Sequence, residues 1–171
     1  MQHKLDLTIA TTLDCNYSRF YCFEKKQKAY ITEKVVNNII SRINQKQGLK
    51  HLHITWFGGE PLMAYDKIEY FNSKLNLPSS VYYTTNLITN GYYLTKDVIL
   101  SLRKNKIDAI RLTLDGLKDS HNKRRRCKET KDTFTAVFNN IDTFMEHEKR
   151  YYAYHTCKLR RKKQARVYRV V

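Results

Sequence analysis

Residues 12–24 read Thr-Leu-Asp-Cys-Asn-Tyr-Ser-Arg-Phe-Tyr-Cys-Phe-Glu, and the rest of the chain is best understood from this stretch outward. It follows Leu5–Ala10, where apolar and polar residues alternate as in a half-buried strand. It precedes a segment with helical spacing. We therefore expect a long loop at the carboxyl end of a first strand. This loop carries two cysteines, Cys15 and Cys22, seven positions apart.

Three further strands and four helices follow in alternation. The remaining strands are expected at His51–Phe57, Val81–Thr85 and Ile110–Leu114. Apolar residues spaced three and four apart indicate helices over 36–43, 68–75, 98–102 and 134–145. Thr32 and Thr95 are suited to cap the first and third of these helices. Four strand–helix units in succession predict an α/β fold with a parallel sheet and right-handed crossovers.

The unusual residues all lie where strands end. These positions carry the cysteine loop, Gly58-Gly59-Glu60-Pro61, Thr89-Asn90-Gly91 and Asp115-Gly116. The carboxyl ends of parallel strands meet at one rim, which is where such folds bind ligands and carry out chemistry. We therefore expect these four segments to form one site.

The cysteine loop resembles the cluster-binding loop of radical S-adenosylmethionine (SAM) enzymes, whose pattern is Cys-x-x-x-Cys-x-aromatic-Cys. Cys15 matches the first cysteine, Tyr21 the aromatic residue and Cys22 the third cysteine, while Arg19 stands at the middle cysteine. The resemblance implies that Cys15 and Cys22 are ligands of a 4Fe-4S cluster and that Tyr21 lies in the cofactor site. Arginine offers no lone pair to iron, so we expect weak or absent cluster binding. On spacing alone, two ordinary thiols near a turn are the alternative.

The glycine-rich turn is the second point of resemblance. Gly58 and Gly59 would let the backbone approach a ligand closely, and the Glu60 carboxylate could hold an ammonium group. The family uses this motif for the amino group of SAM, which implies that role for Glu60. Without the cysteine loop before it, the segment would read as a turn leading into a helix.

Two later strand ends complete the resemblance. Asn90 falls on the family's Thr-Asn-Gly segment, although Asn-Gly is also an ordinary turn signal. Thr113 and Asp115 fall on its Ser-x-Asp-Gly strand end. Arg125 falls on the arginine of its His-Asp-x-x-Arg segment, in which Asn122 replaces the aspartate. The resemblance implies that Arg125 pairs with the carboxylate of SAM; a solvated basic loop is the alternative.

The resemblance covers about residues 4–148 and implies a partial radical SAM core domain over residues 1–148. The family barrel has six strand–helix units, so four units imply an incomplete (β/α) barrel. Local sequence most resembles the peptide- and protein-modifying maturases of the SPASM type, which implies a peptide or protein substrate. In intact relatives the cluster passes an electron to SAM and produces a deoxyadenosyl radical. We expect this copy to be truncated and impaired.

Residues 149–171 differ in character from the rest. They hold nine basic residues and no acidic one, more than half of the net charge of +16. We expect no fifth strand there and interpret the segment as a basic tail foreign to the fold, for instance out of frame. The charge leaves a nucleic-acid-binding protein as an alternative, which rests on this tail, the basic run 123–126 and the many tyrosines of the chain. A SAM-binding remnant without redox chemistry is a third possibility.

Composition sets the remaining expectations. The chain has 171 residues, of which 42% are apolar, enough for one folded domain. It contains no apolar run of about 20 residues, the length that spans a bilayer. Its start lacks a secretory signal, so a cytoplasmic location is expected, where cysteines stay reduced.

Overall fold

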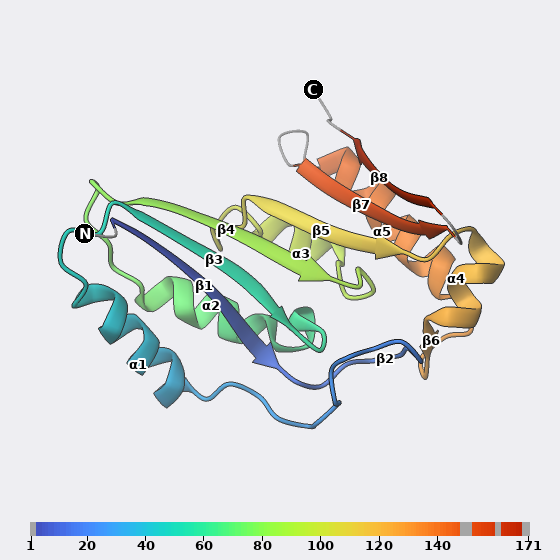
Figure 1. The fold of residues 1–171 in the computed structure, drawn as a ribbon, viewed down its shortest axis with the longest axis horizontal. Helices are drawn as coiled ribbons and strands as arrows, with labels where there is room; N and C mark the ends of the chain where they lie inside the picture. The colour runs from blue at the N-terminus through green and yellow to red at the C-terminus, as the bar shows by residue number, and fades with distance from the viewer. Residues whose placement is uncertain (1–2, 148–151, 160–161, 169–171) are drawn as a thin grey trace.

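The computed structural model describes residues 3–147, 152–159 and 162–168. A six-stranded sheet runs through it in the order β1-β3-β4-β5-β7-β8 (Figure 1). The first five strands of this order are parallel, and β8 is antiparallel to β7. The strands span Lys4–Thr12 (β1), His51–Gly58 (β3), Tyr82–Thr89 (β4), Ala109–Leu114 (β5), Tyr152–Leu159 (β7) and Lys162–Tyr168 (β8).

Helices connect consecutive strands, and this confirms the four expected strand–helix units. They span Glu33–Asn44 (α1), Tyr65–Lys74 (α2), Lys96–Ser101 (α3), Lys118–Arg124 (α4) and Thr133–His147 (α5), with a 3-10 turn at Pro61–Ala64 (η1). Thr32 caps α1 as expected, because its side chain accepts from the Val35 amide. Neighbouring strands follow sequence order, as in a (β/α) barrel, and the sheet is open at β1 and β8.

The hydrophobic core lies between the helices and one face of the sheet. Along β3, Leu52, Ile54 and Trp56 are fully buried, while His53 and Thr55 point to the other face. Trp56 meets Phe71 of α2 with ring centroids 5.1 Å apart. One core cluster includes residues from α1, α2, α3 and α5, so these helices cover the same face.

Three features differ from the sequence expectations. A strand, β7, pairs in parallel with β5, so the expectation of no fifth strand was wrong. The free edge of β5 offers unpaired backbone groups, and these can recruit a segment that shows no clear alternation. The strand β4 runs to Thr89, four residues beyond the predicted end, and α4 was not predicted as a helix. The division of the chain at residue 148 stays a prediction.

A small second sheet joins the cysteine loop to the segment after α4. It pairs β2, Tyr17–Ser18, with β6, Arg126–Cys127, in antiparallel fashion. Figure 1 shows it beyond the carboxyl end of β1, on the side where the parallel strands end. Within the described ranges, no helix has the length and hydropathy needed to cross a bilayer.

Candidate functional site

The cysteine loop is docked on the Gly58-Gly59 turn by backbone contacts. The Gly59 amide donates to the Thr12 carbonyl at 2.9 Å, and the Glu60 amide donates to the Asp14 carbonyl at 2.8 Å. A Cβ atom at Gly58 would lie 2.2 Å from the Thr12 carbonyl oxygen, and one at Gly59 would lie 2.1 Å from that of Asp14. Both glycines are therefore required for the loop to lie this close.

Glu60 is a fully buried carboxylate that ties two strand ends together. It accepts from the Thr89 hydroxyl at 2.6 Å, the Asn90 amide at 2.7 Å and the Leu62 amide at 3.1 Å. Burial raises the pKa of Glu60, and these three hydrogen bonds, followed by the Arg19 charge, oppose the rise. A carboxylate has about four acceptor positions. These three hydrogen bonds occupy three of those positions.

Asn90 holds the cysteine loop from the β4 side. Its side-chain NH2 donates to the Asn16 side chain at 2.8 Å and lies 4.0 Å from the Cys15 sulfur. Its side-chain oxygen accepts from the Tyr92 amide at 2.9 Å, an Asx turn that fixes the side chain. The structure thus brings the predicted residues Asn90, Glu60 and Cys15 together.

The two cysteines of the loop lie in different environments. Cys15 is buried, and its sulfur accepts from the Tyr17 amide at 3.4 Å. Burial raises the pKa of the Cys15 thiol, partly opposed by that hydrogen bond. Cys22 is half-buried, and its sulfur accepts from the Arg19 guanidinium at 3.3 Å. The Cys22 amide in turn donates to the Arg19 carbonyl at 3.2 Å, which closes a tight turn.

The donor set does not fit a 4Fe-4S cluster held by three thiolates. The loop supplies Cys15 and Cys22, and the intervening family position is Arg19, whose guanidinium contacts Cys22 directly. Across the part of the chain that the structure describes, no group of three or more His, Cys, Asp or Glu side chains could hold a metal ion. Clusters of this class are held by cysteine thiolates. Weak or absent cluster binding stays a prediction.

Asp115 and Arg125 form a buried ion pair at the end of β5. The Arg125 Nε lies 3.2 Å from Asp115 Oδ2, and the two side chains are 2% and 0% exposed. Tyr21 donates its hydroxyl to the same carboxylate oxygen. Burial lowers the pKa of Arg125; the Asp115 charge opposes this and the Arg19 charge adds to it. The structure therefore brings three predicted site residues into contact: Tyr21, Asp115 and Arg125.

Several buried polar atoms at this place lack hydrogen bonds. Tyr17 Oη, Asp115 Oδ1 and Arg125 Nε have no hydrogen-bond partner within the described ranges. The Arg125–Asp115 contact is an ion pair whose geometry does not satisfy a hydrogen bond at Nε. Unpartnered buried groups are costly in folded proteins and commonly mark a ligand or water position. Their concentration here points to a polar ligand.

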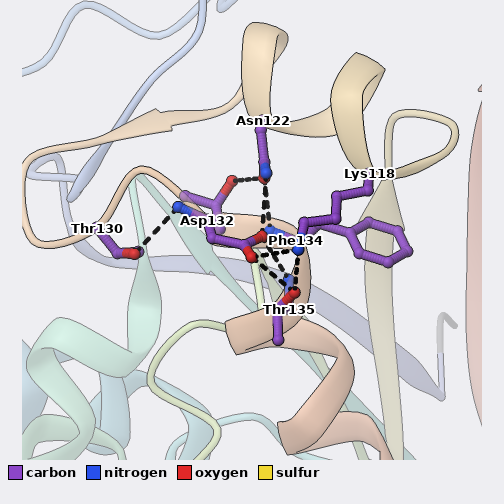
Figure 2. Close-up of polar contacts among 7 residues, drawn as sticks. Lys118, Asn122, Thr130, Asp132, Phe134 and Thr135 are labelled. Atoms are coloured by element: carbon purple, nitrogen blue, oxygen red, sulfur yellow. Dashed lines mark hydrogen bonds and ion pairs between the residues drawn. The ribbon is translucent and has the colours of Figure 1, made fainter.

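Asn122 departs from the family's aspartate, and the structure gives it a capping role. Its side-chain oxygen accepts from the Phe134 amide at 2.8 Å, and its NH2 donates to Asp132 at 3.0 Å (Figure 2). Asp132 accepts from the Thr135 amide at 3.1 Å and pairs with Lys118 at 2.6 Å. Asn122 and Asp132 together satisfy the N-terminus of α5, which positions the segment that ends in Arg125.

Other residues complete the account of the site. Thr113 lies half-buried on β5 on the face opposite Leu112, and it shares no hydrogen bond with the groups above in the described structure. Sequence reasoning placed Tyr17 and Thr89 in segments of the expected site but assigned neither a role, and both are buried. Thr89 directly precedes Asn90, so its place at a strand end was the available signal. Tyr17 carried no such signal.

Comparisons with known proteins agree with this geometry. The family model described as the radical SAM superfamily matches residues 8–156, which includes the first part of the predicted tail. The cysteine-type anaerobic sulfatase-maturating enzyme of Clostridium perfringens (strain 13 / Type A) is 27% identical over 148 residues, 78% of this chain and 39% of that protein. The serine-type anaerobic sulfatase-maturating enzyme of Klebsiella aerogenes is 25% identical over 146 residues, 78% of this chain and 35% of that protein.

Solved structures show the same likeness. Native anSMEcpe with bound AdoMet and Cp18Cys peptide superposes with a TM-score of 0.72 at 25% identity, covering 86% of this chain and 42% of that one. BtrN in complex with AdoMet and 2-DOIA has a TM-score of 0.55 at 13% identity, which shows the fold alone; it covers 88% of this chain and 56% of that one. The chain spans about two fifths of the length of the curated relatives that it matches.

Proposed function

The chain belongs to the radical SAM superfamily, and on this premise we propose that it is the SAM-binding core of a peptide- or protein-modifying maturase that does not assemble its iron–sulfur cluster. The similarity to sulfatase-maturating enzymes supports the maturase class. The relative anSMEcpe binds AdoMet and a peptide, which supports SAM and a peptide or protein as the ligands proposed here.

The proposed SAM site uses the converging strand ends. Glu60 is assigned to the α-ammonium group, because it is a buried carboxylate with acceptor capacity left. Arg125 is assigned to the α-carboxylate, because a guanidinium matches a carboxylate with paired hydrogen bonds. Gly58 and Gly59 support this site by holding the loop in place. The remaining members are Tyr21, Asn90, Thr113 and Asp115.

One contact gives the main support for the proposed absence of the cluster. Arg19 donates to Cys22 at 3.3 Å, so the position of the middle ligand holds a cation directed at one of the two remaining thiols. When bound in relatives, the cluster supplies the electron that cleaves SAM. Two thiolates and an arginine cannot replace three thiolates, so we assign no radical step to this chain.

Anaerobic reconstitution with iron and sulfide tests the proposal. The full chain should retain far less than the about four irons of one cluster. Arg19→Cys should gain iron toward that number, whereas Arg19→Ser should not, because serine removes the cation without adding a thiolate. Cys15→Ser in the Arg19→Cys background should abolish the gain. About four irons in the unaltered chain, together with SAM cleavage, would overturn the proposal.

A further inference from the structure

Arg19 is a half-buried cation without an acidic partner. In the described part of the chain, no carboxylate lies within ion-pair distance of its guanidinium. Its guanidinium donates a hydrogen bond to the Cys22 sulfur, a weak acceptor. An arginine has five donor positions, so most of its capacity remains available. The described fold therefore does not depend on the remaining donor positions of Arg19.

The Arg19 guanidinium lies beside the buried polar groups of the SAM site. Its central carbon is 6.0 Å from the centre of the Tyr21 ring. Tyr21 donates to Asp115, and Asp115 pairs with Arg125 at 3.2 Å. Arg19 is also close enough for its charge to act on Cys15, Glu60 and Arg125. Arg19 thus lies beside Tyr21 and Arg125 beside Asp115, and Tyr21 and Asp115 are the two partners of one hydrogen bond.

This charge balance favours an anion. Like charges at Arg19 and Arg125 destabilise each other unless negative charge lies between or beside them. Asp115 supplies one negative charge. Its Oδ2 already accepts a hydrogen bond from the Tyr21 hydroxyl and forms the ion pair with Arg125. The Arg125 Nε lacks a hydrogen bond in the described structure although its side chain is 2% exposed. A carboxylate ligand would satisfy both arginines.

We propose that Arg19 is a ligand-binding residue, and that it binds the α-carboxylate of SAM or S-adenosylhomocysteine together with Arg125 in the absence of a cluster. The proposal rests on the proposed function, because it takes SAM as the ligand of this site. Guanidinium groups hold carboxylates through paired, charge-assisted hydrogen bonds. Arg19 thereby converts a position for a metal ligand into a position for an anion.

Calorimetric titration of the iron-free full chain with S-adenosylhomocysteine tests this role. Arg19→Gln should weaken binding about tenfold or more, because it removes a charge-assisted hydrogen bond. Arg19→Lys should fall between Arg19→Gln and the unaltered chain. Lys28→Gln, which removes one charge at an exposed position of the same loop, should bind as the unaltered chain does. Circular dichroism should show the same fold in all four proteins.

A ligand without the carboxylate separates the possible outcomes. 5′-Methylthioadenosine keeps the nucleoside but lacks the amino acid group, so Arg19→Gln should bind it as the unaltered chain does. Equal affinity of Arg19→Gln and the unaltered chain for S-adenosylhomocysteine would overturn the role of Arg19 and leave the proposed function intact. Absence of S-adenosylhomocysteine binding by every variant, Arg19→Cys with its cluster included, would overturn the proposed function itself.

Discussion

Gly59 shows how one residue can set the position of the whole cysteine loop. Its backbone φ is not in the left-handed region, so it is not required for a turn. It is required because the Asp14 carbonyl oxygen lies where a side chain would begin, 2.1 Å from the Cβ position. The Glu60 amide, next in the chain, donates to that same oxygen at 2.8 Å. Any larger residue at Gly59 therefore displaces the loop.

We predict that Gly59→Ala destabilises the protein by about 1–3 kcal/mol, since overpacking forces the backbone to shift. It should also expose Cys15, a residue of this loop that is buried while the loop is docked. Urea unfolding measures the first effect, and the rate of Cys15 labelling by a thiol reagent, followed by mass spectrometry, measures the second.

Gly48→Ala is the matched control for this change. Gly48 has a φ of +69° but open surroundings, with His3 3.7 Å from the Cβ position. Alanine at position 48 should be destabilising because of this positive φ, but it should not move the cysteine loop. Its stability should fall while the labelling rate of Cys15 stays unchanged. Equal labelling rates in Gly59→Ala and Gly48→Ala would contradict the docking role of Gly59.

The site residues could be predicted where they follow strand ends. Glu60, Asn90 and Asp115 were placed together from the sequence because parallel strands end at one rim. Their partners could not be predicted. The Thr89 hydroxyl reaches Glu60 across 29 positions, and the Asn16 side chain reaches Asn90 across 74. Such contacts depend on strand register, which local patterns do not specify.

At the scale of elements, α4 and α5 are joined by polar caps rather than by an apolar stripe alone. Helix N-termini leave amides without partners inside the helix. Asn122 of α4 accepts from the Phe134 amide, and Asp132 accepts from the Thr135 amide (Figure 2). The Asp132 carboxylate also meets Lys118 at 2.6 Å. These contacts hold the end of α4, and with it Arg125, against the start of α5.

We predict that Asp132→Ala lowers stability at neutral pH and makes stability less dependent on pH in acid. Hydrogen bonds from Lys118 and Asn122 lower the pKa of Asp132 in the folded state. A depressed carboxyl pKa stabilises the fold above the unfolded value of about 4, and this contribution is lost as pH falls below it. Melting temperatures recorded from about pH 7 to about pH 3 measure both the loss of stability and its dependence on pH.

Asp142→Ala provides the control on the same helix. Asp142 is exposed near the end of α5, away from its capped start. The melting temperatures of Asp142→Ala should run parallel to those of the unaltered chain. The gap between Asp132→Ala and the unaltered chain should narrow in acid. A gap that stays constant with pH would refute the role of the Asp132 charge.

Elements with strong periodicity were predicted, and α4, which lacks it, was missed. The apolar stripe of α5 and the alternation of β3 lie where the sequence indicated. The α4 sequence, Lys118–Arg124, is nearly all polar, and its contact with the interior is the single buried residue His121. Helix formation there depends on packing against α5, which only the folded chain provides.

At the scale of the whole molecule, the sheet face opposite the helices is largely polar. His53 Nδ1 lies 2.8 Å from the Thr84 hydroxyl, and the Asn86 side chain lies 3.1 Å from His53 Nε2. Asp6 and Thr8 are exposed on β1. A polar face can meet water without the penalty that an apolar core face would carry. The sheet edges, which carry unpaired backbone groups, are therefore the parts of the sheet most prone to aggregation.

The β1 edge is the described edge most suited to pairing with another chain. Its carboxyl half is covered, because the Ile31 amide donates to the Thr11 carbonyl at 2.9 Å and Thr12 bridges to Tyr30. The middle of β1, residues 8–10, runs beside an apolar groove of about 450 Å³, lined in part by Ile9, Val35 and Ile39. An uncovered strand edge next to apolar surface favours strand addition.

We predict that the full chain self-associates through this edge and that Thr8→Lys reduces the association, because a charge on an edge strand opposes pairing. Light scattering as a function of protein concentration measures this self-association. Asn38→Lys adds the same charge at an exposed position of α1 and should scatter as the unaltered chain does. If both variants reduce scattering equally, net charge rather than the β1 edge governs association. If only Thr8→Lys does so, the association site is the strand that leads into the cysteine loop.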